Sequence, residues 1–210
     1  MPPKTKTSRT LLAGAVLFLL ATCLSAALRL SASVYQPQAP AYRWEGPPDA
    51  PVVIAEFSDF QCGGCRAAAE PLNQLKTLFS GKLRLVFKHS PWDFHQNARA
   101  AAVAAECAGR AGKFWAYHDA LFAHQQDWGA MEKPEKLFAA YAKEAGIDEA
   151  SFTACLRGPD AAAQVDKDMQ EAKQRWVRAT PTFFINGRRF VGIRQLRSSG
   201  FNFIERTLKK

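Results

Sequence analysis

Two cysteines separated by two glycines, Cys62 and Cys65, are the residues of this sequence best suited to reversible sulfur chemistry. Glycine permits a tight turn, so the backbone between them can bring the two sulfur atoms within bonding distance. A helical pattern begins at Arg66, and the unpaired N–H groups of a helix start favour a thiolate. We therefore expect a lowered pKa at Cys62 as the attacking sulfur, with Cys65 resolving the mixed disulfide.

The same spacing also occurs in metal sites and in inert structural disulfides. Zinc normally takes four ligands, so Cys62 and Cys65 would need a second pair of cysteines or histidines. No such pairing is visible among the four histidines, which are His89, His95, His118 and His124. Two thiolates could hold soft copper, but the sequence has only three methionines and no histidine cluster. A copper-binding module is thus the weaker alternative, and no cofactor is predicted.

The elements around the cysteine pair are a strand, a turn and a helix. Residues 52–57 form a short apolar run typical of a buried strand, and helix-like spacing covers residues 66–79. A second strand is expected over residues 83–88. Two strands joined through a helix pair in parallel by a right-handed crossover. This order predicts an α/β fold.

The rest of the chain is helical before it returns to strands. Asn186-Gly187 separates the short strand patterns 182–185 and 189–191 and is a strong hairpin signal. A terminal helix is expected over residues 194–208. Helical spacing before the hairpin covers residues 96–111, 113–125, 134–145, 148–156 and 160–176.

The first residues carry an export signal. Residues 1–9 are basic and are predicted to stay in the cytoplasm, and the nineteen residues 10–28 have no charge. A run of this length suits either a membrane anchor or a signal peptide. Residues 29–50 are rich in proline and are expected to form a linker, and residues 51–210 the catalytic domain outside the cytoplasm.

Three fates of the uncharged run compete. An uncleaved inner-membrane anchor is the first choice, because the run is long and a linker follows it. Cleavage after Ala27, which would release the domain to the periplasm, follows from the small residues Ser25 and Ala27. Lipidation at Cys23 is the third, although Thr22 is bulky for such a site, and an inert thiol in an apolar helix is the plainer interpretation of Cys23.

Export changes the interpretation of the remaining cysteines, since disulfides persist in oxidising compartments. Cys62 and Cys65 are too close to staple the fold, which leaves Cys107 and Cys155 as the candidate structural disulfide. Such a bridge would close a loop of about fifty residues. Two separate buried thiols are the alternative.

Charge is a weaker guide. The formal net charge is +9. From Arg188 onward the sequence contains seven basic residues and one acidic residue, Glu205. Such a patch could meet phosphate, but charge runs are usually solvated surface. No nucleic-acid motif accompanies it, so no nucleic-acid partner is predicted.

Two segments, EFSDFQCGGC at 56–65 and ATPTFFING at 179–187, resemble the DsbA-type branch of the thioredoxin superfamily. The resemblance covers residues 50–210 and implies a thioredoxin-like fold with a helical subdomain inserted at about 95–176. It also implies a cis Thr180–Pro181 bond, with the backbone of Thr180 presented to a substrate chain. Glu56 would be a buried acid that accepts the proton of Cys65, with an outward-facing strand residue as the alternative. Lys88 is either its partner or a solvated lysine at the end of the strand.

Two departures bear on the direction of electron flow. Strong oxidants of this family carry Pro-His between the cysteines, whereas this chain has Gly63-Gly64, and Thr180 replaces the valine common in the oxidases. The resemblance implies an enzyme that exchanges disulfides in exported proteins, most simply by oxidising their thiols and passing electrons to a membrane redox partner. An extracytoplasmic disulfide reductase, for example in cytochrome maturation, is the alternative. No residues remain for a dimerisation domain, so we expect a monomer.

Overall fold

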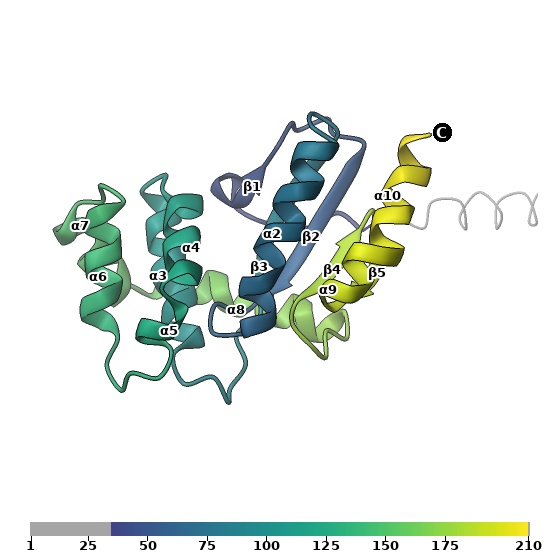
Figure 1. Ribbon diagram of the computed structural model, residues 1–210. Helices are drawn as coiled ribbons and strands as arrows, with labels where there is room; N and C mark the ends of the chain where they lie inside the picture. Colours follow the sequence, from purple (N-terminus) through teal and green to yellow (C-terminus); the bar gives the residue numbers. More distant parts are fainter. Residues whose placement is uncertain (1–34, 210) are drawn as a thin grey trace, which may run out of the picture. The chain divides into compact units, whose positions relative to one another are not determined.

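The computed structural model describes residues 35–209, and a five-stranded mixed sheet lies at its centre (Figure 1). Its strand order is β1-β3-β2-β4-β5, with β2 and β3 parallel and the other neighbouring pairs antiparallel. The parallel pair is the crossover that the sequence predicts. The strands are β1 (Trp44–Glu45), β2 (Val52–Ser58), β3 (Leu83–His89), β4 (Thr182–Ile185) and β5 (Arg188–Val191).

Two helices cover one face of the sheet. Helix α2 (Gly63–Leu78) and helix α10 (Phe201–Leu208) lie side by side in front of the strands in Figure 1. Their apolar side chains and those of the strands form one core cluster, which includes Leu72, Phe183 and Ile204. A short helix α9 (Gly192–Gln195) and a π-helical turn η2 (Leu196–Gly200) connect β5 to α10.

The helical subdomain follows β3 and ends before β4, as predicted. Its own core is aromatic and includes Phe114, Tyr117 and Trp128. The last helix, α8, contacts β3 and leads the chain back to the sheet. The helices are α3 (Ala98–Arg110), α4 (Phe114–Ala123), α5 (Gln125–Trp128), α6 (Glu135–Glu144), α7 (Glu149–Arg157) and α8 (Pro159–Gln174).

The hairpin between β4 and β5 turns at Asn186 and Gly187, as predicted. Both residues have positive φ, 44° and 83°, as a two-residue type I′ turn requires. The Asn186 side chain also accepts a hydrogen bond from the amide of Val53 at 2.7 Å. The turn is thereby attached to β2, which leads to the cysteine pair.

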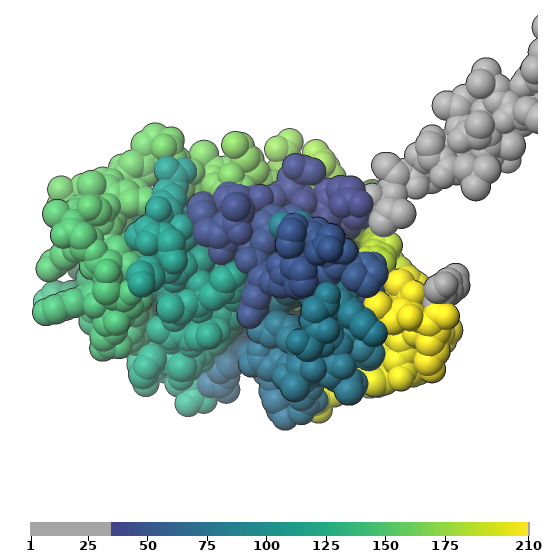
Figure 2. All heavy atoms as spheres, turned by 90° about the horizontal axis from the view of Figure 1, so that it is seen from above, coloured from purple at the N-terminus to yellow at the C-terminus, as the bar shows by residue number. Residues whose placement is uncertain are grey.

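The linker predicted over residues 29–50 is too long. Residues 37–210 form one compact unit: residues Ala41–Arg43 form a 3-10 turn (η1), β1 pairs with β3, and Arg43 is fully buried. Figure 2 shows this purple segment lying against the teal helices of the subdomain. A buried cation needs partners, so this segment folds with the domain although its composition resembles a linker.

A buried ionic cluster holds that segment in place. Arg43 Nε lies 3.2 Å from Glu106 Oε1 on α3, and Arg43 also pairs with Asp168 on α8. Lys88 Nζ lies 2.5 Å from Asp168 Oδ1, and His89 Nε2 lies 2.9 Å from Glu106 Oε1. These side chains are at most 2% exposed. Because each charge has a buried partner, removing one member would leave another uncompensated.

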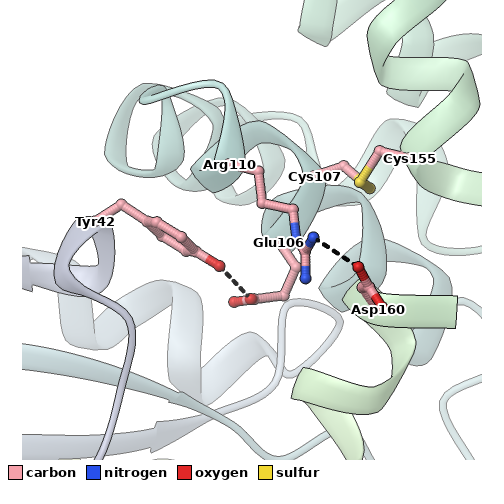
Figure 3. The surroundings of a disulfide bond; sticks show 6 residues. All are labelled: Tyr42, Glu106, Cys107, Arg110, Cys155 and Asp160. Atoms are coloured by element: carbon pink, nitrogen blue, oxygen red, sulfur yellow. Dashed lines mark hydrogen bonds and ion pairs between the residues drawn. A yellow bond between two sulfur atoms is a disulfide. The ribbon is translucent and has the colours of Figure 1, made fainter. Parts of the chain in front are cut away.

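A disulfide joins Cys107 on α3 to Cys155 on α7, which is the pairing proposed from the sequence (Figure 3). Immediately before Cys107 on α3, Glu106 accepts a hydrogen bond from the hydroxyl of Tyr42 at 2.7 Å. Gly109 lies below the Tyr42 ring, where a Cβ atom would come within 2.4 Å of it. Helix α3 therefore carries one cysteine of the disulfide and also contacts Tyr42 of the segment before β2.

The anchor or signal predicted over residues 10–28, with Cys23 inside it, lies outside the described residues. Across residues 35–209, none of the helices combines the length and apolar character needed to cross a bilayer.

Candidate active site

The cysteine pair lies where the chain leaves β2 and enters α2. Cys62 is the N-cap residue of α2 and is partly exposed, whereas Cys65 is one turn further along and is 1% exposed. Both are free thiols. The backbone at Gly64 lies close to the site, since a Cβ there would be 3.4 Å from Pro181 Cδ and 3.6 Å from the Cys62 sulfur. These are ordinary van der Waals distances, so a side chain at position 64 would contact both Pro181 and the attacking sulfur.

Thr180 and Pro181 lie directly beside the attacking sulfur. The peptide bond between them is cis, as the resemblance implied. The Thr180 carbonyl oxygen lies 3.5 Å from Cys62 Sγ. The Thr180 hydroxyl accepts a hydrogen bond of 2.9 Å from the indole nitrogen of Trp92. The loop before β4 and the loop after β3 therefore meet at the cysteine pair.

The two thiols have opposite electrostatic environments. The hydrogen bond with the Cys65 thiol is the largest cause that lowers the pKa of Cys62 to about 5, while burial opposes it. The Thr180 side chain and the amides of Gly64 and Cys65 lower it further. Burial raises the pKa of Cys65 well above its ordinary value, and the neighbouring Cys62 adds to the rise. The pair thus provides one ready thiolate and one protonated thiol.

Glu56 is buried beneath the pair on β2. It is 3% exposed, and burial raises its pKa to about 7, although Ser58 and Lys76 act in the opposite direction. Glu56 and Cys65 line one cavity of about 70 Å³, which has room for water. A carboxyl group with a pKa near neutrality can accept and return a proton under physiological conditions.

The sequence suggested Lys88 as a partner of Glu56, but the structure shows that Lys88 binds elsewhere. Its ammonium group binds Asp168 and Glu171 on α8, at 2.5 and 2.8 Å. Successive strand residues point to opposite faces of a sheet, and Lys88 pairs in register with Phe57, the neighbour of Glu56. The cation near Glu56 is instead Lys76, on the last turn of α2.

Several residues around the pair were not predicted. Asp59 is buried and accepts hydrogen bonds from the amides of Gln61 and Trp92, and its carboxylate lies 2.8 Å from His95 Nδ1. Gln125 of the helical subdomain donates hydrogen bonds to the carbonyl oxygens of Phe60 and Cys62. These contacts fix the loop before Cys62. A short polar residue next to a CxxC turn could have suggested the role of Asp59, but nothing in the local sequence indicates Gln125.

The comparisons with known proteins agree with this geometry. A family model described as Thioredoxin matches residues 38–200, so the chain belongs to the thioredoxin family. Among curated relatives, a Na(+)/H(+) antiporter NhaA 1 from Salinispora arenicola is 39% identical over 148 residues, which is 70% of this chain and 22% of that protein. A NhaA of Herminiimonas arsenicoxydans is 36% identical over 147 residues, with the same two shares.

The chain thus spans about a fifth of the length of these relatives. Antiport is the activity that the names of those longer proteins state. Among solved structures, Bacillus subtilis BdbD is 26% identical with a TM-score of 0.69 over 80% of this chain and 93% of that chain. DsbA2 of Pseudomonas aeruginosa is 26% identical with a TM-score of 0.63 over 80% and 97%. The thiol-disulfide exchange protein alpha-DsbA2 of Wolbachia pipientis, at 22% identity and a TM-score of 0.67 over 79% and 86%, shows the same fold.

The family match and these neighbours show a thioredoxin-like fold of the DsbA type, as the resemblance in the sequence implied. Within residues 35–209, no group of three or more His, Cys, Asp or Glu side chains is arranged to hold a metal ion.

Proposed function

We propose that the protein oxidises thiols of exported proteins, with Cys62 as the exchange sulfur. Substrate thiolates attack it in the oxidised protein, and its own thiolate is the nucleophile when the reduced protein is reoxidised. A substrate thiolate attacks the Cys62–Cys65 disulfide at Cys62, and a second substrate thiolate attacks the mixed disulfide. The substrate leaves with a disulfide and the enzyme with two thiols, so two electrons pass to the enzyme. A membrane redox partner then takes those electrons and restores the Cys62–Cys65 bond.

The hydrogen bonds at Cys62 are the observation that carries the proposed direction. They stabilise a thiolate, which exists only in the reduced protein, and the pKa of about 5 keeps Cys62 ionised at neutral pH. Stabilising the reduced form makes the disulfide form a stronger oxidant. The Gly63-Gly64 dipeptide adds no charge, but the Cys65 thiol and the Thr180 side chain supply the stabilisation instead.

Glu56, Thr180 and Pro181 have supporting roles in this proposal. Glu56 accepts the proton of Cys65 when the membrane partner re-forms the disulfide, and the cavity that they share provides the route. The backbone of Thr180, beside Cys62, offers strand-like hydrogen bonds to an extended substrate chain. We further propose that the domain acts as a monomer outside the cytoplasm, tethered by residues 10–28, with release to the periplasm or lipidation at Cys23 as alternatives.

The reduction potential of the pair tests the direction. Equilibration with glutathione buffers of known ratio, followed by alkylation and mass measurement, should give a value above about −200 mV, the range of oxidising members of this superfamily. A value near −270 mV, as in thioredoxin, would support the reductase alternative instead.

Alkylation tests the assignment of the nucleophile. Iodoacetamide at pH 6 should modify Cys62 of the reduced protein well before Cys65, because only the Cys62 thiol is ionised at that pH. Equal rates at the two positions would contradict the assignment.

A further inference from the structure

A groove of about 580 Å³ lies between the loop after β3 and the end of α8. We call it the Trp92–Trp176 groove. The residues that line it and that the argument uses are Trp92, Asp93, Met169, Lys173, Trp176 and Arg178.

Trp92 connects the groove to the candidate active site. Trp92 forms part of the groove wall, and the Trp92 indole donates a hydrogen bond of 2.9 Å to the Thr180 hydroxyl. The Thr180 carbonyl oxygen in turn lies 3.5 Å from the Cys62 sulfur. A polypeptide whose cysteine reacts at Cys62, and whose backbone lies along Thr180, therefore passes next to Trp92, which forms part of the groove wall.

Trp176 is displayed to solvent at a position that rarely holds a large residue. It follows the C-cap of α8, has a φ of 55° and is 64% exposed. The amides of Trp176 and Val177 bond back to the carbonyls of Lys173 and Ala172, at 3.1 and 2.9 Å. Glycine is the usual residue at this left-handed position. A bulky indole there carries a backbone cost of the kind found at ligand-binding positions.

A further exposed aromatic side chain lies next to Trp92. Phe94 is 75% exposed and stacks on Trp92, with ring centroids 5.7 Å apart. Trp92, Trp176 and Met169 give the groove apolar walls, and Phe94 extends the exposed apolar surface beside them. Exposed apolar surface bordered by polar groups is typical of a binding site.

The charged side chains of the Trp92–Trp176 groove indicate which kind of peptide segment it would bind. Lys173 and Arg178 are exposed, and the Arg178 guanidinium lies 5.0 Å from the centroid of the Trp176 ring. Asp93 is the one acidic residue that lines the groove. Cations therefore outnumber anions around the apolar walls, which favours an acidic neighbour on the bound segment.

We propose that the Trp92–Trp176 groove binds an extended segment of the protein substrate close to its reacting cysteine and selects a large apolar or aromatic side chain with an acidic neighbour. This inference rests on the proposed exchange with protein thiols and adds a substrate preference to it. Aromatic rings on the protein provide rigid, apolar contact surface at low entropic cost, as at other peptide-binding surfaces.

Synthetic peptides test the preference with the full chain in its oxidised form. Each peptide carries two reduced cysteines, flanked on both sides by Trp-Glu, Ala-Glu or Trp-Lys, and the rate of peptide disulfide formation gives kcat/KM. Each rate is divided by the rate of the same protein with dithiothreitol. We expect the Trp-Glu peptide to exceed each of the other two by about tenfold, the effect of about 1.4 kcal/mol of binding.

Variants assign the preference to the groove. Trp176→Gly removes the ring at a backbone position that glycine favours, so the fold is retained, and the advantage of Trp-Glu over Ala-Glu should fall below about twofold. Arg178→Glu should lower the advantage of Trp-Glu over Trp-Lys. Leu78→Ala, which removes another exposed apolar side chain at the end of α2, should change neither ratio.

Equal rates for the three peptides, or a preference that survives Trp176→Gly, would overturn the proposed groove. If the protein reacts with dithiothreitol but with none of the peptides, or with neither, the failure lies in the proposed function itself. The dithiothreitol rate thus separates the two outcomes.

Discussion

The molecule holds two pairs of cysteines in contrasting surroundings. Cys62 and Cys65 are free thiols at a helix start, where hydrogen bonds stabilise one thiolate and burial keeps the other protonated. Cys107 and Cys155 form a disulfide between two helices of the subdomain. The comparison teaches that the reactivity of a cysteine comes from the surroundings of its sulfur atom, namely its hydrogen bonds and exposure, rather than from the residue type alone.

Of the substitutions at the two cysteine pairs, replacement of Cys62 should lower the rate of thiol oxidation most. Cys62→Ser removes the attacking sulfur, and oxidation of a reduced peptide should fall to the rate of buffer alone. The double variant Cys107→Ser/Cys155→Ser should retain at least half of the parental rate, because neither residue lies at the candidate site. Comparable losses in both variants would mean that the second pair takes part in exchange.

The second pair should instead govern stability. A disulfide that spans 48 residues of sequence restricts the unfolded chain, and its loss typically costs about 2–4 kcal/mol. We expect urea unfolding of Cys107→Ser/Cys155→Ser to show a decrease of that size in the free energy of unfolding. Cys62→Ser/Cys65→Ser, compared with the reduced parent below about pH 5, where the Cys62 thiolate no longer stabilises the folded state, should show no comparable loss. An unchanged midpoint for the subdomain variant would contradict a structural role.

Glu56 links redox chemistry to stability in the first region. Its pKa of about 7 in the folded protein, against an ordinary value of 4.5, means that the folded state favours the protonated form. Stability therefore falls as pH rises from about 4.5 through 7, and the loss is complete above that range. The glutamine of Glu56→Gln cannot ionise. The unfolding free energy of this variant should therefore exceed that of the parent by an amount that grows from near zero at pH 4.5 to roughly 2–3 kcal/mol at pH 8.

Urea unfolding at several pH values measures this difference, with Glu132→Gln at an exposed position as the control. The same variant should slow attack by Cys65 on a mixed disulfide by about a hundredfold at pH 7, since no proton acceptor remains beneath the thiol. A pH-independent difference in stability would show that Glu56 ionises normally. An unchanged rate would remove it from the proposed mechanism.

The sequence indicated most of the fold because its signals are local. The apolar run before Cys62, the glycines between the cysteines and the Asn186-Gly187 turn each determine their own geometry. The segment 37–50 was misread because its prolines resemble a linker, whereas its place in the domain depends on Arg43 meeting Glu106 and Asp168 from distant helices.

The site shows the same division between local and distant contacts. Local spacing was enough to identify Cys62 and Cys65, but it could not show that Trp92 and Gln125 approach them from elsewhere in the chain. Lys88 illustrates the limit, because strand alternation places it on the face opposite Glu56 and toward α8. Pairing across the fold, rather than residue type, decides such roles.

The smallest expected effect concerns the exposed ion pair near the disulfide. Arg110 Nη1 on α3 lies 3.3 Å from Asp160 Oδ2 on α8, and their side chains are 42% and 73% exposed (Figure 3). Solvent screens such a pair, so a double-mutant cycle of Arg110→Gln and Asp160→Asn should give a coupling energy of at most about 0.5 kcal/mol, decreasing with added salt. The nearby disulfide also connects α3 to the following helices, but salt does not weaken a covalent bond. A coupling above about 1 kcal/mol that persists in 1 M salt would mean that the Arg110–Asp160 ion pair contributes to the packing of α3 against α8. A small coupling would leave that role to the Cys107–Cys155 bond and to the buried cluster around Arg43.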